Sequence, residues 1–405
     1  MSQFSRSIKR SDFKLRHYPT PAAGNRVLVL LLALGLVSAL TLPFLTIAPN
    51  RLVSGTGVSL GALLHGPGWA ALLPVVVLAW AALVPQRPRH AAAVSLACAA
   101  AAAVLLAALL GLAAQVAALQ TRDGNTLVRV SFGGAFWSLA VLSWLAAADA
   151  LQRAQLAPLP RALAHAAVGL PCVALLASGA LNDLSLLKEY ANRRDAFHAA
   201  AVQHLHIVAA TLLPALAIGV PLGVAAARSP RLARPLFAVL NVIQTVPSIA
   251  LFGLLIAPLV ALAALLPGAG IQGIGLLPAV IALTLYALLP IVHNTAAGLR
   301  QVPAAAVEAA TGMGMTRSQR FWRVEVPLAL PLLWSGLRLT TVQVIGLAVV
   351  AALIGAGGFG AIVFQGLLSS ALDLVLLGVL PVVALALLAD ALFDTVDSLL
   401  ARQAR

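Results

Sequence analysis

Long, uninterrupted stretches of apolar residues constrain this 405-residue chain more than any other feature of its sequence. Several stretches exceed about 18 residues, the length that a helix needs to cross a hydrocarbon layer about 30 Å thick. Hydrophobic residues make up 61% of the chain and charged residues 9%, so a soluble domain of this size would expose too much apolar surface. We therefore expect an all-α, polytopic membrane protein.

The apolar stretches predict ten membrane spans, five in each half of the chain. They cover residues 27–48, 69–85, 91–119, 131–150, 162–181, 205–227, 236–262, 274–296, 327–353 and 373–396. The first span follows a basic segment, but its apolar run of about 22 residues is longer than that of a cleavable signal peptide. We expect this span to be retained.

The net charge of +14 indicates membrane topology rather than binding to nucleic acid. If the N-terminus is cytoplasmic, the inside segments carry 19 of the 26 Lys and Arg residues and the outside segments carry six, while Arg338 lies within the ninth span. An excess of Lys and Arg on the cytoplasmic side is the usual topology signal. We predict that both termini are cytoplasmic and that nucleic acid is not a partner.

The organisation of the chain changes near residue 182. A basic segment, 1–26, precedes five spans in 27–181 that are rich in Ala and Leu and contain almost nothing polar. Residues 182–204 are polar, with apolar positions at helical spacing, so we expect an amphipathic surface segment on the outside. The other five spans occupy 205–396, with one long loop at 297–326, and 397–405 form a cytoplasmic tail.

The loop at 297–326 contains the start and stop signals of two short helices. Pro303 favours a helix start, and Gly312 and Gly314 are expected to end that helix. Thr316 can cap a second helix, with Gln319 as its capping-box partner, before Pro327 marks the return to the membrane. Such a hairpin suits docking into another protein, although an interfacial helix pair that meets lipid headgroups would have the same pattern.

A resemblance favours docking. The hairpin resembles the EAA loop of ABC importer permease subunits in the spacing of Glu308, Ala309, Ala310, Gly314, Val324 and Pro327. That family usually has Ile and Leu where this chain has Val324 and Val326, and both changes keep an aliphatic side chain. The resemblance implies a type I permease core in the C-terminal half and a loop that couples it to a cytosolic ATPase.

Other stretches narrow the resemblance. The sequences LLKEYANRRDAF, NVIQTVPSIALFGLL, LPAVIALTLYALLPIVHNT and LIGAGGFGAIVFQGL look like the osmoprotectant branch of that family, over about residues 182–396. This implies a bacterial inner-membrane permease for glycine betaine or choline, with amino acids as the alternative substrate. It also implies a second permease subunit and a periplasmic binding protein as partners. The first five spans show no usable resemblance to a known family, and we expect them to be accessory.

Polar residues inside the later spans are candidates for the translocation path. They are Asn241, Gln244, Thr245 and Ser248 in the seventh span and Gln343 in the ninth. Those of the seventh span would share one face of a single helix, and Pro247 would break that helix and free backbone carbonyls. Hydrogen bonding between helices is an equally common use of such residues.

Three further patterns are weaker. The GAGGFG stretch at 355–360 matches a dinucleotide-binding pattern but follows a membrane span, so we expect a turn there instead. His198, His204 and His206 are read as interfacial residues rather than metal ligands. Asp390, Asp394 and Asp397 are expected on a solvated face, with contacts to Arg402.

The energy source is expected to lie outside the chain. The sequence contains no GxxxxGK[ST] loop, so we expect no cofactor in this chain and no enzymatic activity, with ATP and Mg²⁺ bound by the partner ATPase. The spans from the sixth to the ninth also lack a central Asp or Glu, which counts against a secondary carrier. A secondary carrier or a membrane scaffold remains the alternative to an ABC permease.

Overall fold

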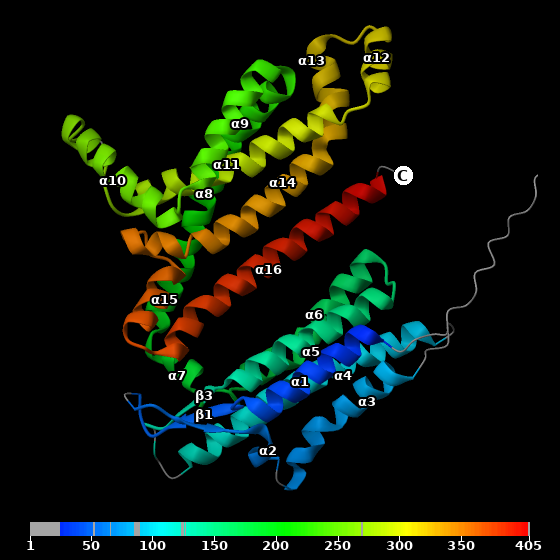
Figure 1. Ribbon diagram of the computed structural model, residues 1–405, viewed down its shortest axis with the longest axis vertical. Coiled ribbons are helices and arrows are strands. Elements are labelled where there is room, and N and C mark those ends of the chain that lie inside the picture. Colours follow the sequence, from blue (N-terminus) through cyan, green and yellow to red (C-terminus); the bar gives the residue numbers. More distant parts are fainter. Residues whose placement is uncertain are drawn as a thin grey trace, which may run out of the picture.

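The computed structural model describes residues 25–403, except 52, 65, 85–89, 123, 124, 126 and 269. Two groups of helices lie side by side (Figure 1). The N-terminal half contains α1 (Arg26–Thr41), β1 (Leu45–Ala48), β2 (Thr56–Val58), α2 (Leu60–Leu63), a 3₁₀ helix (Gly66–Leu72), α3 (Leu73–Leu83), α4 (Ala91–Thr121), β3 (Arg129–Phe132), α5 (Gly134–Arg153) and α6 (Pro158–Ala177).

The C-terminal half begins with the short α7 (Ser185–Asn192), which leads into α8. It continues with α8 (Arg194–Arg228), α9 (Pro230–Thr245), α10 (Ser248–Leu265), α11 (Leu276–Arg300), α12 (Ala304–Gly312), α13 (Arg317–Arg320), a π-helical turn (Phe321–Glu325), α14 (Val326–Leu347), a 3₁₀ helix (Val350–Ile354), α15 (Phe359–Leu368) and α16 (Leu372–Gln403). The predicted amphipathic segment at 182–204 therefore contains α7 and the first turns of α8, which runs on without a break into the sixth span.

The all-α, polytopic membrane fold is confirmed. Within the described residues, eight helices are long and apolar enough to cross a membrane, and the predicted first two spans correspond to the shorter apolar helices Arg26–Thr41 and Gly68–Leu83. The helix that contains the ninth span starts before the predicted span and is continuous from Arg317 to Leu347.

The predicted first span is wrong in its second part. Helix α1 ends at Thr41, and Leu42 adopts an extended conformation, as expected of a residue that precedes Pro43. Residues 45–48 then form β1, the central strand of a three-stranded sheet with the order β2-β1-β3. Both pairings are antiparallel, and Leu45 lies opposite both Val58 and Phe132. The apolar run at 27–48 thus forms two elements, a helix and then a strand at the end of the helical bundle.

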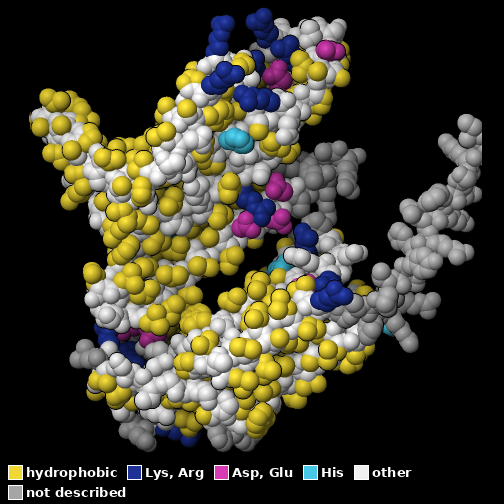
Figure 2. All heavy atoms as spheres, in the orientation of Figure 1, with side chains coloured by type: hydrophobic (Ala, Val, Ile, Leu, Met, Phe, Trp, Pro, Cys, Tyr) yellow, Lys and Arg dark blue, Asp and Glu magenta, His cyan; other side chains and the backbone are white. Residues whose placement is uncertain are grey.

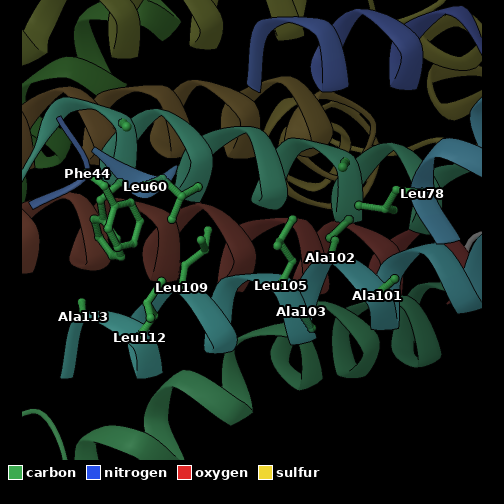
Figure 3. Close-up of a cluster of buried hydrophobic side chains, with 14 of the residues drawn as sticks. Phe44, Leu60, Leu78, Ala101, Ala102, Ala103, Leu105, Leu109, Leu112 and Ala113 are labelled. Carbon is green, nitrogen blue, oxygen red and sulfur yellow. The ribbon is translucent and has the colours of Figure 1, made fainter. Parts of the chain in front are cut away.

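Alanine allows the helices of the N-terminal half to pack closely. The long helix α4 packs against α3, α5 and α6, with Ala102 and Leu109 each 1% exposed. Figure 3 shows these residues in one layer with Leu78, Leu105 and Phe44. At the end of β3, Phe132 stacks on Phe136 of α5 with ring centroids 3.9 Å apart. The core of this region extends to Leu184, just before α7, and Leu186 and Leu187 of α7 pack against it.

The C-terminal half is organised around α8 and α11, which pack at backbone distance. A Cβ atom added to Gly219 would lie 2.7 Å from Ile291 Cγ2, and one added to Gly223 would lie 2.5 Å from the Cβ of Thr295. Both distances are shorter than a real contact, so only glycine fits. The two glycines are four residues apart, the small-xxx-small spacing that lets membrane helices approach closely.

Helix α7 connects the two halves through a buried carboxylate. Glu189 is 3% exposed. Its oxygens lie 3.3 Å from Arg51 Nε, 3.9 Å from Arg129 Nη1 and 3.6 Å from Arg193 Nε. Arg51 and Arg129 come from the sheet region, whereas Arg193 immediately precedes α8. A buried charge of this kind is tolerated only because opposite charges surround it.

Two hydrogen bonds reinforce this junction. Lys188 Nζ donates to the carbonyl of Val128 at 3.2 Å, and Ser131 Oγ donates to Asp373 Oδ2 at 2.6 Å. Partial burial lowers the pKa of Lys188 from its usual value because less water solvates the charged amine. The sheet therefore contacts both α7 and the start of α16.

Farther along the helices, the halves separate. Figure 2 shows a hollow between them in the space-filling view. In this region, among the described residues, an ion pair connects α6 to α16: Arg161 Nη2 lies 3.7 Å from Asp394 Oδ2. The halves are thus fastened firmly near the sheet and loosely at the other end.

The acidic residues of α16 have a partner that the sequence analysis did not pair with them. Asp390 binds Arg338 of α14 through both oxygens, at 2.6 and 2.8 Å, and Asp394 and Asp397 lie within 3.7 and 3.9 Å of the same guanidinium. An arginine within a span needs such compensation. The side chain of Arg402, the expected partner, lies outside the described residues.

The GAGGFG stretch forms the expected turn. Gly355, Gly357 and Gly358 all have positive φ angles, of 82°, 81° and 72°. The turn is held against α8, because Gln203 Nε2 donates to the carbonyl of Ala356 at 3.0 Å. It reverses the chain between the 3₁₀ helix and α15.

Candidate coupling loop and translocation path

The helical hairpin at residues 304–325 is formed by local backbone geometry. Helix α12 ends in a Schellman motif, in which the N–H of Met315 binds the carbonyl of Ala310 and the N–H of Gly314 binds that of Thr311. Gly314 has φ +80°, the left-handed conformation that this motif requires. The prediction that the chain turns at the glycines is confirmed, with Gly314 as the residue that makes the turn.

The second helix of the hairpin starts as predicted and ends differently. Thr316 and Gln319 form a complete capping box, with hydrogen bonds of 2.9 and 3.3 Å. The helix then passes through the π-helical turn directly into α14, so it does not stop at Pro327. Pro327 follows directly on the π-helical turn, where the regular α-helical hydrogen-bond ladder that a proline interrupts is already broken.

The residues of the resemblance lie on the hairpin with different exposures. Glu308, Ala309, Gly314 and Pro327 are exposed, Val324 is half-buried, and Ala310 is 1% exposed. Ala310 is the one buried residue of α12. The helix therefore presents most of its surface outward and has little packing of its own.

Two large exposed apolar residues extend this surface. Met313 is 70% exposed and Trp322 is 65% exposed. The sequence reasoning did not single them out, although both lie inside the loop that it selected. Exposed large apolar side chains next to a small-residue helix are typical of a protein-binding surface.

Glu325 fixes the hairpin to the helical bundle, and the sequence reasoning missed it. Its Oε2 lies 3.0 Å from Arg228 Nη2, and its Oε1 lies 3.0 Å from Arg320 Nε. Arg228 also lies over the ring of Phe321, 5.1 Å from its centroid. Arg320 donates to Thr311 Oγ1 at 3.3 Å. The available signal was one of two acidic residues in a mostly basic loop, but its partner Arg228 lies 97 positions away.

The candidate path residues of the seventh span do not share one helical face. The span is divided into α9 and α10, and Val246 and Pro247 between them have extended backbones. The break at Pro247 was predicted, but the periodicity across it was wrong, because a helical repeat does not continue through extended residues. Asn241 and Thr245 are exposed at the end of α9, and Ser248 is half-buried at the start of α10.

Gln244 is engaged in a contact between helices. Its Nε2 donates to the carbonyl of Tyr286 on α11 at 2.6 Å. The hydroxyl of Tyr286 donates in turn to the carbonyl of Val246, which the helix break has freed. Gln343 is half-buried on α14 and is not joined to this group by a described hydrogen bond.

His198 and His204 of α8 have different surroundings. His204 is fully buried, and its Nε2 lies 3.2 Å from the carbonyl of Ile345. His198 lies beside Tyr190, 3.4 Å from its hydroxyl. Within the described part of the chain, no group of three or more His, Cys, Asp or Glu residues is placed to hold a metal ion.

Comparison with known families also divides the chain into an N-terminal and a C-terminal region, with the boundary between residues 187 and 219. Residues 219–402 match the model of the binding-protein-dependent transport system inner membrane component. Residues 25–187 match the model of the N-terminal domain of the ABC transporter permease YehY. The N-terminal half, for which the sequence alone offered no resemblance, thus corresponds to a described domain.

Individual relatives cover the C-terminal half. The osmoprotectant import permease protein OsmW of Salmonella typhimurium is 44% identical over 188 residues, which are 46% of this chain and 84% of the relative. The carnitine transport permease protein OpuCB of Listeria monocytogenes is 41% identical over 46% of this chain and 80% of its own length. The glycine betaine/carnitine/choline transport system permease protein OpuCB of Bacillus subtilis is 35% identical over 46% and 81%.

One solved structure with similarity is that of the MetNI methionine ABC transporter in inward-facing conformations. It is 24% identical, with a TM-score of 0.45, over 50% of this chain and 96% of the matched chain.

Proposed function

Because the chain belongs to the binding-protein-dependent transport system inner membrane components, which are the permeases of ABC importers, we propose that it imports glycine betaine, choline or carnitine. The substrate class is supported by the relatives, whose names specify osmoprotectants, carnitine, glycine betaine and choline. These molecules share a quaternary ammonium group. The permease forms the membrane pathway, and a separate ATPase supplies the energy.

The observation that carries the coupling role is the exposed helical hairpin at 304–325. Its first helix keeps Glu308 and Ala309 on the surface and buries only Ala310. Its turn is fixed by Gly314, and its second helix continues into α14. A rigid, outward-facing helix with so little packing of its own is suited to binding a groove on a cytosolic ATPase, which would bind ATP and Mg²⁺.

The orientation follows from this role. If the hairpin is cytoplasmic, both termini are cytoplasmic, and α7 and the sheet lie on the periplasmic side of a bacterial inner membrane. The periplasmic binding protein would then meet the end of the molecule where α7, the sheet and the glycine turn lie. This assignment agrees with the distribution of Lys and Arg between the two sides.

A second permease subunit is expected to cover α10. This helix contacts the remainder of the chain mainly through α11, and Ile249, Leu254 and Val260 are 61%, 64% and 52% exposed. Its position away from the bundle is visible in Figure 1. The exposed polar ends of α9, with Asn241 and Thr245, lie next to the break and would line the pathway between two subunits, together with Ser248 and Gln343.

The N-terminal half is assigned an accessory role. It has a separate apolar core, and its polar contacts to the C-terminal half are concentrated at α7 and the start of α16. It would therefore affect stability, partner choice or regulation rather than the pathway itself.

Transport by the complete complex tests this function. The permease is reconstituted in proteoliposomes with its ATPase and binding protein, and uptake of labelled glycine betaine, choline and carnitine is compared with uptake of several amino acids. ATP-dependent uptake of a quaternary amine is expected. Uptake of amino acids alone would overturn the substrate class, and uptake without ATP would overturn the ABC mechanism.

A further inference from the structure

We propose that Glu325 is the positioning residue that transmits movement of the hairpin to α8, so that the Arg228–Glu325 pair links ATP hydrolysis to transport. This inference rests on the proposed coupling role of the hairpin. It assigns the transmission to a contact outside the spacing on which the resemblance was based.

The first step is that α12 cannot orient itself. It is nine residues long and buries only Ala310, so apolar packing contributes little to its position. Its polar contact to the second helix runs from Thr311 to Arg320 at 3.3 Å. Besides the turn at Gly314, the direction of α12 therefore depends on where Arg320 is held.

The second step is that Glu325 holds Arg320 and Arg228 together. One carboxylate oxygen binds each arginine at 3.0 Å, and the side chain of Glu325 is only 14% exposed. Charge-assisted hydrogen bonds in such a setting are stronger than those between exposed groups. Without the carboxylate, two guanidinium groups would face each other in a partly buried site. The contact is thus directional and sensitive to loss of one charge.

The third step is that α8 is built to carry a displacement. Arg228 is the last residue of a helix of 35 residues, which is about 52 Å long. Arg300 Nη2 also donates to the carbonyl of Ala226 at 2.7 Å, which fixes this end of α8 to α11. Near its other end, Gln203 binds the glycine turn through Ala356. A shift at Glu325 would therefore reach the far end of the bundle along α8, which runs past Pro214 and Pro221 without ending.

The test compares hydrolysis with uptake in the reconstituted complex of permease, ATPase and binding protein. The variants are Glu325→Gln, Arg228→Met, Arg228→Lys and the double variant of the first two, with the exposed Arg231→Met as the matched control. Measurements are ATPase co-purification, ATP hydrolysis with and without loaded binding protein, and uptake of labelled glycine betaine, choline and carnitine.

Glu325→Gln and Arg228→Met are expected to retain the ATPase but to transport at least about tenfold less substrate per ATP hydrolysed, because either change breaks the link between the hairpin and α8. Glu325→Gln in addition leaves the guanidinium groups of Arg228 and Arg320 without their shared carboxylate. The double variant should be no worse than Glu325→Gln alone, because that variant has already lost the contact that Arg228→Met removes. Arg228→Lys should restore part of the ratio, and Arg231→Met should keep it unchanged. A simple loss of folded protein would lower hydrolysis and uptake together and leave their ratio intact.

An unchanged ratio of uptake to hydrolysis in Arg228→Met would overturn the inference. Arg228 is half exposed, so this variant tests the pair even if Glu325→Gln does not fold. If the unaltered complex takes up none of the three quaternary amines, the proposed substrate is wrong. In that case the same variants are compared by the stimulation of ATP hydrolysis that the binding protein causes, which should be lost in Arg228→Met and kept in Arg231→Met. Stimulation that survives in Arg228→Met would overturn the inference there too.

Discussion

The side-chain amide of Gln244 donates to the carbonyl of Tyr286, and this carbonyl is free because Pro290, four residues later, has no N–H to offer. A polar residue at a helix break thus satisfies a backbone group that a proline in another helix has exposed. In a membrane such a group has no water to bind, so the contact contributes to stability.

We predict that Gln244→Leu destabilises the protein by about 1–3 kcal/mol, because it leaves the Tyr286 carbonyl without a donor. The same substitution combined with Pro290→Ala should be less harmful, since alanine restores the helical N–H. Unfolding in detergent, followed by circular dichroism, measures both effects. Equal destabilisation by Gln244→Leu in both backgrounds would show that the carbonyl is not the reason.

Gly314→Ala should weaken coupling and cost about 1–3 kcal/mol of local stability, because alanine is strained at positive φ. Gly314→Pro should abolish transport, since it also removes the N–H that binds Thr311, while the protein still inserts in the membrane. Gly312→Ala is the control, because Gly312 lies inside α12 and an added Cβ would meet nothing within 4 Å. Uptake and membrane content are measured for all three, and normal uptake with Gly314→Pro would exclude the hairpin from coupling.

Topology can be measured with single cysteines in a background that lacks Cys98 and Cys172. Asn182→Cys, which is exposed before α7, should react with an impermeant maleimide from outside, and exposed Arg317→Cys should react only after permeabilisation. Ala103→Cys is the buried control and should react in neither case. Labelling of position 317 in intact cells would reverse the orientation of the whole chain.

Glu189→Gln should loosen the junction between the halves, because Arg51, Arg129 and Arg193 would face one another without a carboxylate. Loss of about 3–5 kcal/mol is typical when one partner of a buried ion pair is removed. Limited proteolysis between α6 and α7 should become faster. The exposed Glu308→Gln, tested for proteolysis only, should behave like the unaltered protein. A cleavage rate of Glu189→Gln that matches this control would show that the junction does not depend on the carboxylate.

A chain that begins near Asn182, supplied with a signal anchor to keep that end outside, should still bind the ATPase and support some transport. The hairpin and its contacts to Arg228 lie entirely within the retained part. Its stability should be lower, because Leu184 is 1% exposed and Glu189 would lose two of its arginines. Co-purification and uptake are the measurements. If the shortened chain is inserted and folded yet does neither, the N-terminal half belongs to the mechanism.

The membrane class and the hairpin could be read from the sequence because both depend on local patterns. Apolar length identified the spans, and the turn at Gly314 with the capping box of Thr316 follows from residues a few positions apart. The strand at 45–48 was missed because an apolar run has no internal sign of where a helix stops, apart from Pro43. Glu325 was missed because its partner Arg228 is distant in sequence and meets it only in the folded chain.

The glycine turn at 355–358 has a consequence for how evolutionary change in this protein should be interpreted. Gly355, Gly357 and Gly358 are held at positive φ, and an added Cβ on Gly358 would lie 3.2 Å from His204 Nδ1. Other residue types would be removed by selection at these positions whatever the transported molecule is. Invariance of this stretch among homologues would therefore record the shape of a backbone, and a change of substrate would have to be sought among residues that are free to vary.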